Sequence, residues 1–147
     1  MKSLATRLAT ATVVAVTAGS LLAGCGGGSP YCDAVKKDLD TLKTFGKTKS
    51  NAAYTQYADT ARSIAKTAPA SVKKDWTTLA TTTDGILAAQ KDVGVKLEQM
   101  TSAEAVKKLS KADIAKLNVA YKAFNATTDQ RTAVVKNMKQ ECKVTLS

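Results

Sequence analysis

Side chains that commonly carry out enzyme chemistry are missing or scattered in this 147-residue sequence. The chain contains no histidine, which excludes Ser-His-Asp and Cys-His arrangements for nucleophilic catalysis. Its 12 acidic residues would be enough for the carboxylate pair of a glycosidase. They are spread along the polar faces of the expected helices, however, and solvent-exposed acids without a catalytic role are the favoured interpretation. We therefore expect no enzymatic activity, no catalytic residue and no cofactor.

Three aromatic residues are the main alternative to that expectation. Tyrosinate can ligate haem iron, and Tyr54 and Tyr57 are spaced to lie on one face of a helix. The same spacing suits two rings that pack in a helical core with their hydroxyl groups near the surface, and we favour this interpretation. Trp76 is likewise expected in the core, and a wall of a ligand cavity is its alternative role. A carrier of haem or of a small apolar ligand is thus the second functional hypothesis.

The N-terminal residues follow the order of a secretory signal. Residues 1–7 carry Lys2 and Arg7 and no acid, and residues 8–22 are uncharged. The uncharged stretch is too short and too rich in threonine for a membrane-spanning helix, which needs roughly 20 mostly apolar residues. The next feature, Leu22-Ala23-Gly24-Cys25, resembles the lipobox of bacterial lipoprotein precursors. The resemblance implies cleavage before Cys25 and a diacylglycerol on the Cys25 thiol.

This resemblance predicts the organisation of the whole chain. Residues 1–24 form a signal peptide that is removed, residues 25–29 a lipidated cysteine with a flexible tether, and residues 30–147 one helical domain. A flexible tether over Gly26–Ser29 spans roughly 10 to 12 Å. We expect an exported protein that is anchored to the outer face of the cell membrane by lipid on Cys25.

Two cysteines remain if Cys25 carries lipid. Cys32 and Cys142 are an even pair in a chain exported to an oxidising space, which predicts a disulfide between them. A loop of about 100 residues closed in this way gains at most about 4.7 kcal/mol in the chain-entropy account. A metal site is not expected, because the chain has no histidine and no third free cysteine.

The expected domain is basic. Without Lys2 and Arg7, 20 Lys and Arg residues stand against 12 Asp and Glu, a net charge of +8. Nucleic acid is not an expected partner, because only two arginines remain. Anionic lipid or a cell-wall polymer fits the charge, and an ordinary solvated surface is the alternative. The lysines form three groups: Lys36, Lys43 and Lys47; Lys107, Lys108 and Lys111; Lys136, Lys139 and Lys143.

Apolar periodicity predicts helices and no strand. A first helix over 30–45 begins at the Ser29-Pro30 cap and stops at Gly46. Asn51 caps a second helix, which Pro69 ends. A third helix extends to about residue 93 with Gly94 as its C-terminal cap, and Gly85 is expected to be a close packing point. The inner face of the second helix is expected to be Tyr54, Tyr57, Ala61, Ile64, Ala65 and Ala68, and that of the third Val72, Trp76, Leu79, Thr83, Ile86, Gln90 and Val93.

Three capping-box patterns divide the rest of the domain. Thr101 with Glu104, Ser110 with Asp113, and Thr127 with Gln130 predict helices over 102–108, 111–124 and 128–142. The expected inner residues are Ile114, Leu117, Tyr121 and Phe124, then Val135, Met138 and Cys142.

Residues 31–146 resemble a group of small secreted or lipid-anchored helical proteins of actinobacteria. The resemblance rests on Cys32-Asp33-Ala34, on Ala68-Pro69 through Trp76 with Leu79, and on Cys142 followed by Val144 and Leu146. Members often have glycine after the final cysteine, where this chain has Lys143. The resemblance implies the fold and the compartment only, because the group has no established activity. We therefore expect an all-α antiparallel bundle of four to five helices, closed by the disulfide, that acts as a non-catalytic binding or interaction module at the cell envelope.

Overall fold

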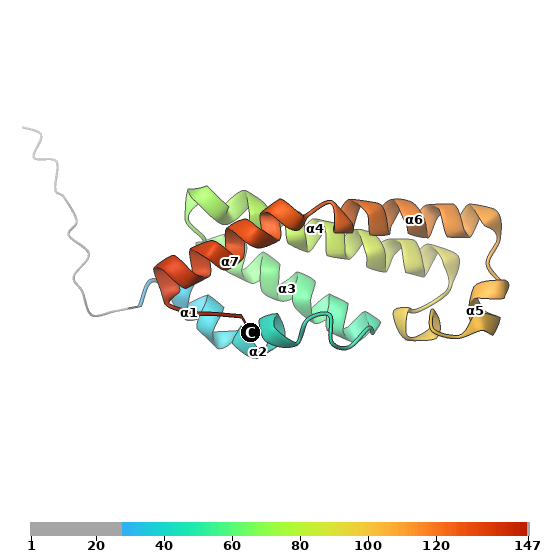
Figure 1. Cartoon of the computed structure of the whole chain (residues 1–147), viewed down its shortest axis with the longest axis horizontal. Coiled ribbons are helices and arrows are strands. Elements are labelled where there is room, and N and C mark those ends of the chain that lie inside the picture. The colour runs from blue at the N-terminus through green and yellow to red at the C-terminus, as the bar shows by residue number, and fades with distance from the viewer. Residues whose placement is uncertain (1–27, 147) are drawn as a thin grey trace, which may run out of the picture.

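The computed structural model describes residues 28–146. The expected signal segment, Cys25 and most of the tether lie outside the described residues. Within residues 28–146, seven α-helices and one short 3-10 helix pack together (Figure 1). No strand forms in this range, although Phe45 and Thr48 make one isolated bridge. The all-α class is therefore confirmed for the described part of the chain.

The first expected helix, over 30–45, is wrong as one continuous element. It is divided into α1 (Pro30–Lys37) and α2 (Leu39–Thr44) by Asp38, which leaves helical geometry. Aspartate is a weak helix former in a helix interior. Its N–H still bonds to the Ala34 carbonyl, so the chain bends without separating. Ser29 caps α1 as predicted, because its hydroxyl accepts a hydrogen bond from the Cys32 N–H at 3.1 Å.

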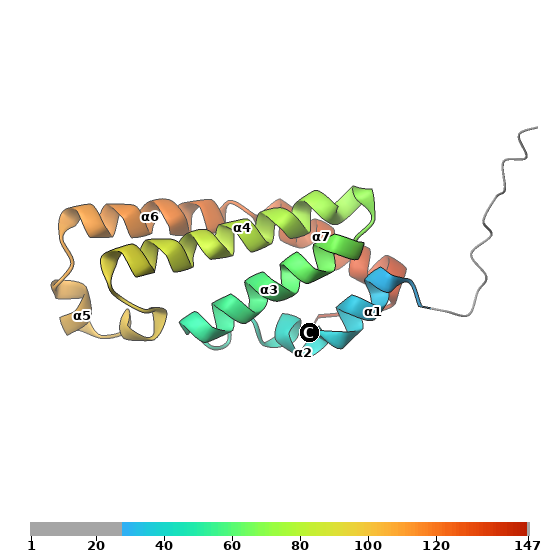
Figure 2. The same cartoon turned by 180° about the vertical axis from the view of Figure 1, so that it is seen from behind.

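The two longest helices form the centre of the molecule. Helix α3 (Asn51–Thr67) and helix α4 (Ala70–Val93) are joined at Ala68-Pro69 and lie side by side in both views (Figures 1 and 2). Their predicted inner faces are confirmed apart from Val93, which is half-buried: Tyr54, Tyr57, Ala61, Ile64, Ala65, Ala68, Val72, Trp76, Leu79, Thr83, Ile86 and Gln90 are all buried.

Two predicted details of these helices differ in the structure. Ser50, not Asn51, caps α3, because its hydroxyl accepts from the Ala53 N–H. The Asn51 side chain instead accepts from the Leu97 N–H at 2.9 Å and so joins α3 to the segment after α4. Gly85 is not a packing point, because it is exposed and nothing lies within 4 Å of an added Cβ.

Gly94 ends α4 as predicted. Its φ of 70° is left-handed, a conformation that glycine adopts without steric cost. The Val95 N–H bonds to the Gln90 carbonyl and the Gly94 N–H to the Lys91 carbonyl. These two bonds make a Schellman motif, which satisfies carbonyl groups at the helix end.

Short elements follow at the end of the molecule that contains α5. They are the 3-10 helix η1 (Leu97–Gln99), α5 (Ala103–Lys107) and the start of α6 (Lys111–Asn125). The predicted Ser110–Asp113 capping box is confirmed. The Thr101–Glu104 box is wrong, because the Ser102 hydroxyl accepts from the Ala105 N–H and caps α5.

The last helix, α7 (Thr128–Cys142), follows α6 after a break at Ala126 and Thr127. The expected Thr127–Gln130 box is wrong, because the Thr127 side chain accepts no hydrogen bond from the first turn of α7 and its hydroxyl instead donates to the Phe124 carbonyl. This bond ties the end of α6 to the start of α7.

Two residues expected on inner faces are exposed. Ile114 is 39% exposed and Val135 38% exposed. On α7, Val134, Met138 and Cys142 are buried at steps of four, which places Val135 about 100° around the helix from Val134. The prediction is confirmed for Leu117 and Phe124, which are buried, whereas Tyr121 is half-buried.

The buried residues form two clusters of unequal size. The larger contains residues of α1, α2, α3, α4 and α7 and includes Trp76 and both bonded cysteines. The smaller consists of Tyr54, Ile86, Leu97 and Phe124. Among the described residues, no helix combines the length and apolar character needed to cross a membrane.

Candidate ligand-binding site at the disulfide end

The disulfide between Cys32 and Cys142 is present, as predicted. It joins the first turn of α1 to the last residue of α7, with the two Cα atoms 5.0 Å apart. Both residues are buried, so the bond lies inside the larger cluster. Lys143 follows with a φ of 57°, which is the left-handed conformation that glycine adopts most readily.

Tyr57 is packed in the protein interior and is not arranged as a haem ligand. Its ring stacks on Phe45 with the ring centroids 3.6 Å apart. Burial raises the pKa of Tyr57 to about 12, although the Arg131 charge acts in the opposite direction. Because a haem ligand would have to be tyrosinate, this environment disfavours the role considered for Tyr57.

Tyr54 belongs to the smaller cluster. Burial raises the pKa of Tyr54 as well. The residue also lines a hollow of about 410 Å³ together with Leu97, Tyr121 and Phe124. The structure therefore does not bring Tyr54, Tyr57 and Trp76 together around one cavity of the described domain.

Trp76 is buried as the sequence predicts, and it supports a residue that the sequence did not single out. Its indole Nε1–H donates to the Tyr31 hydroxyl at 3.4 Å. Trp76 is 1% exposed and Tyr31 is 3% exposed. This contact holds the Tyr31 ring at the end of the molecule where the chain enters α1.

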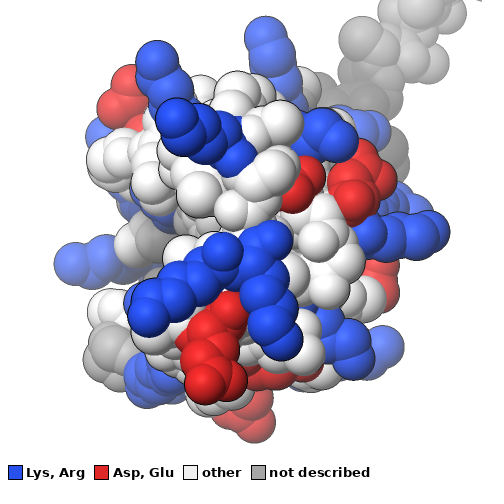
Figure 3. All heavy atoms as spheres, turned by 90° about the vertical axis from the view of Figure 1, so that its right-hand side faces the viewer, with Lys and Arg blue, Asp and Glu red and all other residues white. Residues whose placement is uncertain are grey.

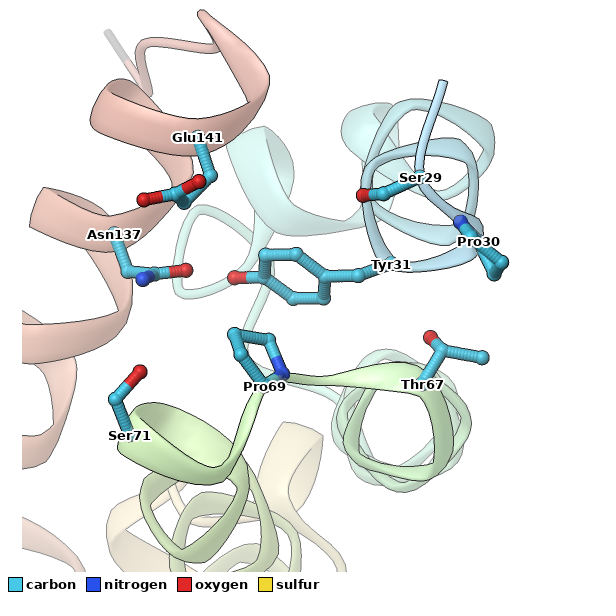
Figure 4. Close-up of a pocket in the computed structure, with 8 residues that line it drawn as sticks. All are labelled: Ser29, Pro30, Tyr31, Thr67, Pro69, Ser71, Asn137 and Glu141. Carbon is cyan, nitrogen blue, oxygen red and sulfur yellow. The ribbon is translucent and has the colours of Figure 1, made fainter. Parts of the chain in front are cut away.

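A pocket of about 600 Å³ opens at the same end (Figure 4). It lies between the beginning of α1, the α3–α4 turn and the last turns of α7. Its volume falls within the range of small-molecule sites, roughly 300–1,000 Å³. Its lining includes Pro30, Tyr31, Pro69, Ser71, Asn137 and Glu141.

Polar atoms from α1 and α7 converge on this pocket. Figure 4 shows the Tyr31 hydroxyl pointing toward α7, from which Asn137 and Glu141 extend into the same space. Burial raises the pKa of Tyr31, the Trp76 hydrogen bond lowers it, and the Glu141 charge raises it further. The hydroxyl of Tyr31 is therefore protonated at neutral pH.

The sequence interpretation missed these pocket residues, although the cysteines carried a usable signal. Tyr31 precedes Cys32 and Glu141 precedes Cys142. A bond between the cysteines brings their neighbours to the same end of the molecule. Asn137 lies four residues before Glu141 and so shares its helix face.

The acids form no cluster suited to a metal. Among residues 28–146, no group of three or more His, Cys, Asp or Glu side chains is placed to hold a metal ion. Arg62 pairs on the surface with Asp59 and Asp84.

The lysines do not form one continuous patch. The group at Lys107, Lys108 and Lys111 lies at the α5 end, opposite the beginning of α1 (Figure 1). Figure 3 faces that end and shows basic side chains projecting on several sides, with acidic side chains between them. The α7 group, with Lys139 and Lys143, belongs to the end that carries the disulfide.

Comparisons with protein-family models, with curated proteins and with solved structures found no match to this chain.

Proposed function

We propose that this protein is an exported lipoprotein that acts as a non-catalytic binding module at the outer face of the cell membrane. The observation that carries the binding role is the pocket between α1 and α7, whose walls are joined by the Cys32–Cys142 bond. Such a covalent link favours ligand affinity, because pocket walls that are already fixed lose less conformational entropy when a ligand binds.

The proposed compartment is supported by two features that agree with each other. Residues 22–25 resemble a lipobox, which would export the chain and place lipid on Cys25. A disulfide of the kind seen here forms and persists in oxidising spaces outside the cytoplasm. The signal peptide, the anchor and the outer-face location form one proposal.

The short tether would hold the pocket close to the membrane. Residue 29 caps α1 and also lines the pocket, so the pocket lies where the tether enters the domain. Lysines 107, 108 and 111 are at the opposite end, along a helix, α4, whose 24 residues span about 36 Å. That distance exceeds the Debye length of about 8 Å in physiological salt. The lysines at the tether end are therefore the better candidates for contact with anionic lipid, and the far group for contact with a cell-wall polymer.

We also propose the finer architecture, an antiparallel bundle of four to five helices. The support is the tight connection at Ala68-Pro69 between α3 and α4, and the packing of α6 and α7 on α4. The haem or apolar-ligand carrier is less well supported, because Tyr57 and Trp76 are buried in packed surroundings.

Replacement of Cys25 tests the anchor. In the expected host, Cys25→Ala should abolish lipid labelling and release the protein from membranes or block its maturation. Cys32→Ala is the matched control, since it removes a cysteine and leaves the lipobox intact, and it should remain in the membrane fraction. Unchanged membrane retention of Cys25→Ala would contradict the proposal.

A further inference from the structure

Two polar groups in the pocket have unused hydrogen-bonding capacity. The Asn137 Oδ1 atom is buried from solvent and has no hydrogen-bond partner among residues 28–146. The Tyr31 hydroxyl accepts from Trp76, yet its own proton has no acceptor in the same range. A buried acceptor without a partner has lost its hydrogen bond to water, so a ligand group that bonds to both Asn137 and Tyr31 would restore favourable hydrogen bonding.

The positions of these groups are fixed by the surrounding structure. Tyr31 and Glu141 are the sequence neighbours of the two bonded cysteines. The buried Trp76 indole donates a hydrogen bond to the Tyr31 hydroxyl and so helps to fix its position. Figure 4 shows the Tyr31 hydroxyl and the Asn137 amide facing each other across the pocket, with Glu141 on the Asn137 side. Ser71 extends from the start of α4 toward the same space.

The combination of donors and acceptors selects the chemistry of a ligand. Asn137 Oδ1 and the Glu141 carboxylate accept hydrogen bonds, whereas the Tyr31 hydroxyl has a proton to donate. A hydroxyl group donates one hydrogen bond and can also accept, so two neighbouring hydroxyl groups can satisfy all three. An ammonium group only donates and would leave the Tyr31 proton unpaired. A phosphate or carboxylate group only accepts and would be repelled by Glu141.

The remaining walls suit the carbon face of a sugar ring. Pro69 presents apolar surface next to the Tyr31 ring, and Pro30 adds apolar surface to the lining on the other side of Tyr31. We propose that this pocket binds a neutral, hydroxyl-rich ligand, namely a sugar unit, through Tyr31, Asn137 and Glu141. The inference rests on the proposed binding role and names its ligand class, and it does not depend on lipid at Cys25.

The test uses the full protein purified in detergent and ¹H–¹⁵N correlation spectra recorded during titration with maltose. Maltose should shift amide signals of the first turn of α1 and the last turns of α7, and leave those of α5 unchanged. Asn137→Leu should weaken maltose binding about tenfold, since it removes the unpartnered acceptor. Asn118→Leu is the matched control on exposed α6 and should bind as the parent does.

A second variant keeps the test informative if Asn137→Leu folds poorly. Glu141→Gln removes one charge at an exposed position and should weaken maltose binding less than Asn137→Leu does. Two results would overturn the sugar assignment: equal maltose affinity in the parent and both variants, or shifts at α1 and α7 with methylammonium or inorganic phosphate and none with maltose. Loss of membrane retention in Cys25→Ala would still support the proposed anchor in either case, so the two proposals fail separately.

Discussion

The two ends of this molecule are stabilised in different ways. At the end where α1 begins, helices from both termini of the domain surround Trp76, and the Cys32–Cys142 bond joins them. At the α5 end, the buried cluster contains only Tyr54, Ile86, Leu97 and Phe124. Local hydrogen bonds supplement that small cluster, including the bond of Asn51 with Leu97 and the Ser110–Asp113 box. The comparison indicates that burial of a large apolar area stabilises the disulfide end, whereas a small cluster and helix capping stabilise the α5 end.

Removal of the Trp76 side chain should produce the largest loss of stability. Trp76→Ala deletes the largest fully buried side chain and the donor to Tyr31, so the free energy of unfolding should fall by about 3–5 kcal/mol. Urea unfolding followed by circular dichroism measures this change. Val119→Ala is the control, because Val119 is 71% exposed, and a comparable loss in that variant would remove the distinction between the core and the surface.

Loss of the disulfide should have the next largest effect. The double variant Cys32→Ala, Cys142→Ala should lose about 2–5 kcal/mol. Hydrogen exchange should accelerate first in α1 and α7, while the amides of α6 change later. Equal acceleration in all helices would show that the bond stabilises both ends of the molecule alike, which would contradict the proposed difference between them.

Alkaline pH tests the tyrosines of the two clusters. The pKa of Tyr57 is raised to about 12, so the unfolded chain releases this proton near pH 10 while the folded protein retains it. Stability from this group is complete below pH 10 and is lost as the pH rises toward 12, by about 2–3 kcal/mol. Unfolding free energies measured across this range should show the decline.

Tyr57→Phe is the matched control, because it removes the ionisable hydroxyl and should therefore reduce the fall in unfolding free energy between pH 10 and 12. Tyr54→Phe, in the smaller cluster, should change the pH dependence less, because burial shifts the pKa of Tyr54 less than that of Tyr57. If Tyr54→Phe reduced the pH dependence of the unfolding free energy more than Tyr57→Phe does, the smaller cluster would contain the more strongly shifted tyrosine, contrary to this account.

The smallest expected effect is at the capped end. Ser110→Ala removes the hydroxyl that accepts from the Asp113 N–H, at a cost of about 1 kcal/mol. Hydrogen exchange should accelerate in the first turn of α6 and remain unchanged in α1. A loss of unfolding free energy as large as that of the disulfide variant would mean that the Ser110 cap stabilises other parts of the molecule besides α6, which would contradict this prediction.

Much of the fold follows from local sequence signals, as α4 shows. Its stripe from Val72 to Gln90 and the glycine at 94 predicted both a buried face and a C-terminal end, because periodicity and capping act within a few residues. The pairing of Cys32 with Cys142 followed from the count of cysteines and the expected compartment.

Other features depend on contacts that local patterns do not encode. Val134 and Val135 are adjacent and equally apolar, and only packing against the rest of the domain decides which one is buried. The bend at Asp38 similarly lets α1 and α2 follow the core in different directions. The pocket required the disulfide, Trp76 and α7 to meet, and so Tyr31, Asn137 and Glu141 did not stand out in the sequence.

Intact-mass analysis of the protein purified from the membranes of its own host, under non-reducing conditions, tests the central claim most directly. We expect a chain that begins at Cys25, carries the mass of a diacylglycerol and contains no alkylatable thiol at Cys32 or Cys142. A membrane-purified chain that retains residues 1–24 without lipid, or that is alkylated at both cysteines, would contradict the proposal of a lipid-anchored, disulfide-closed binding module.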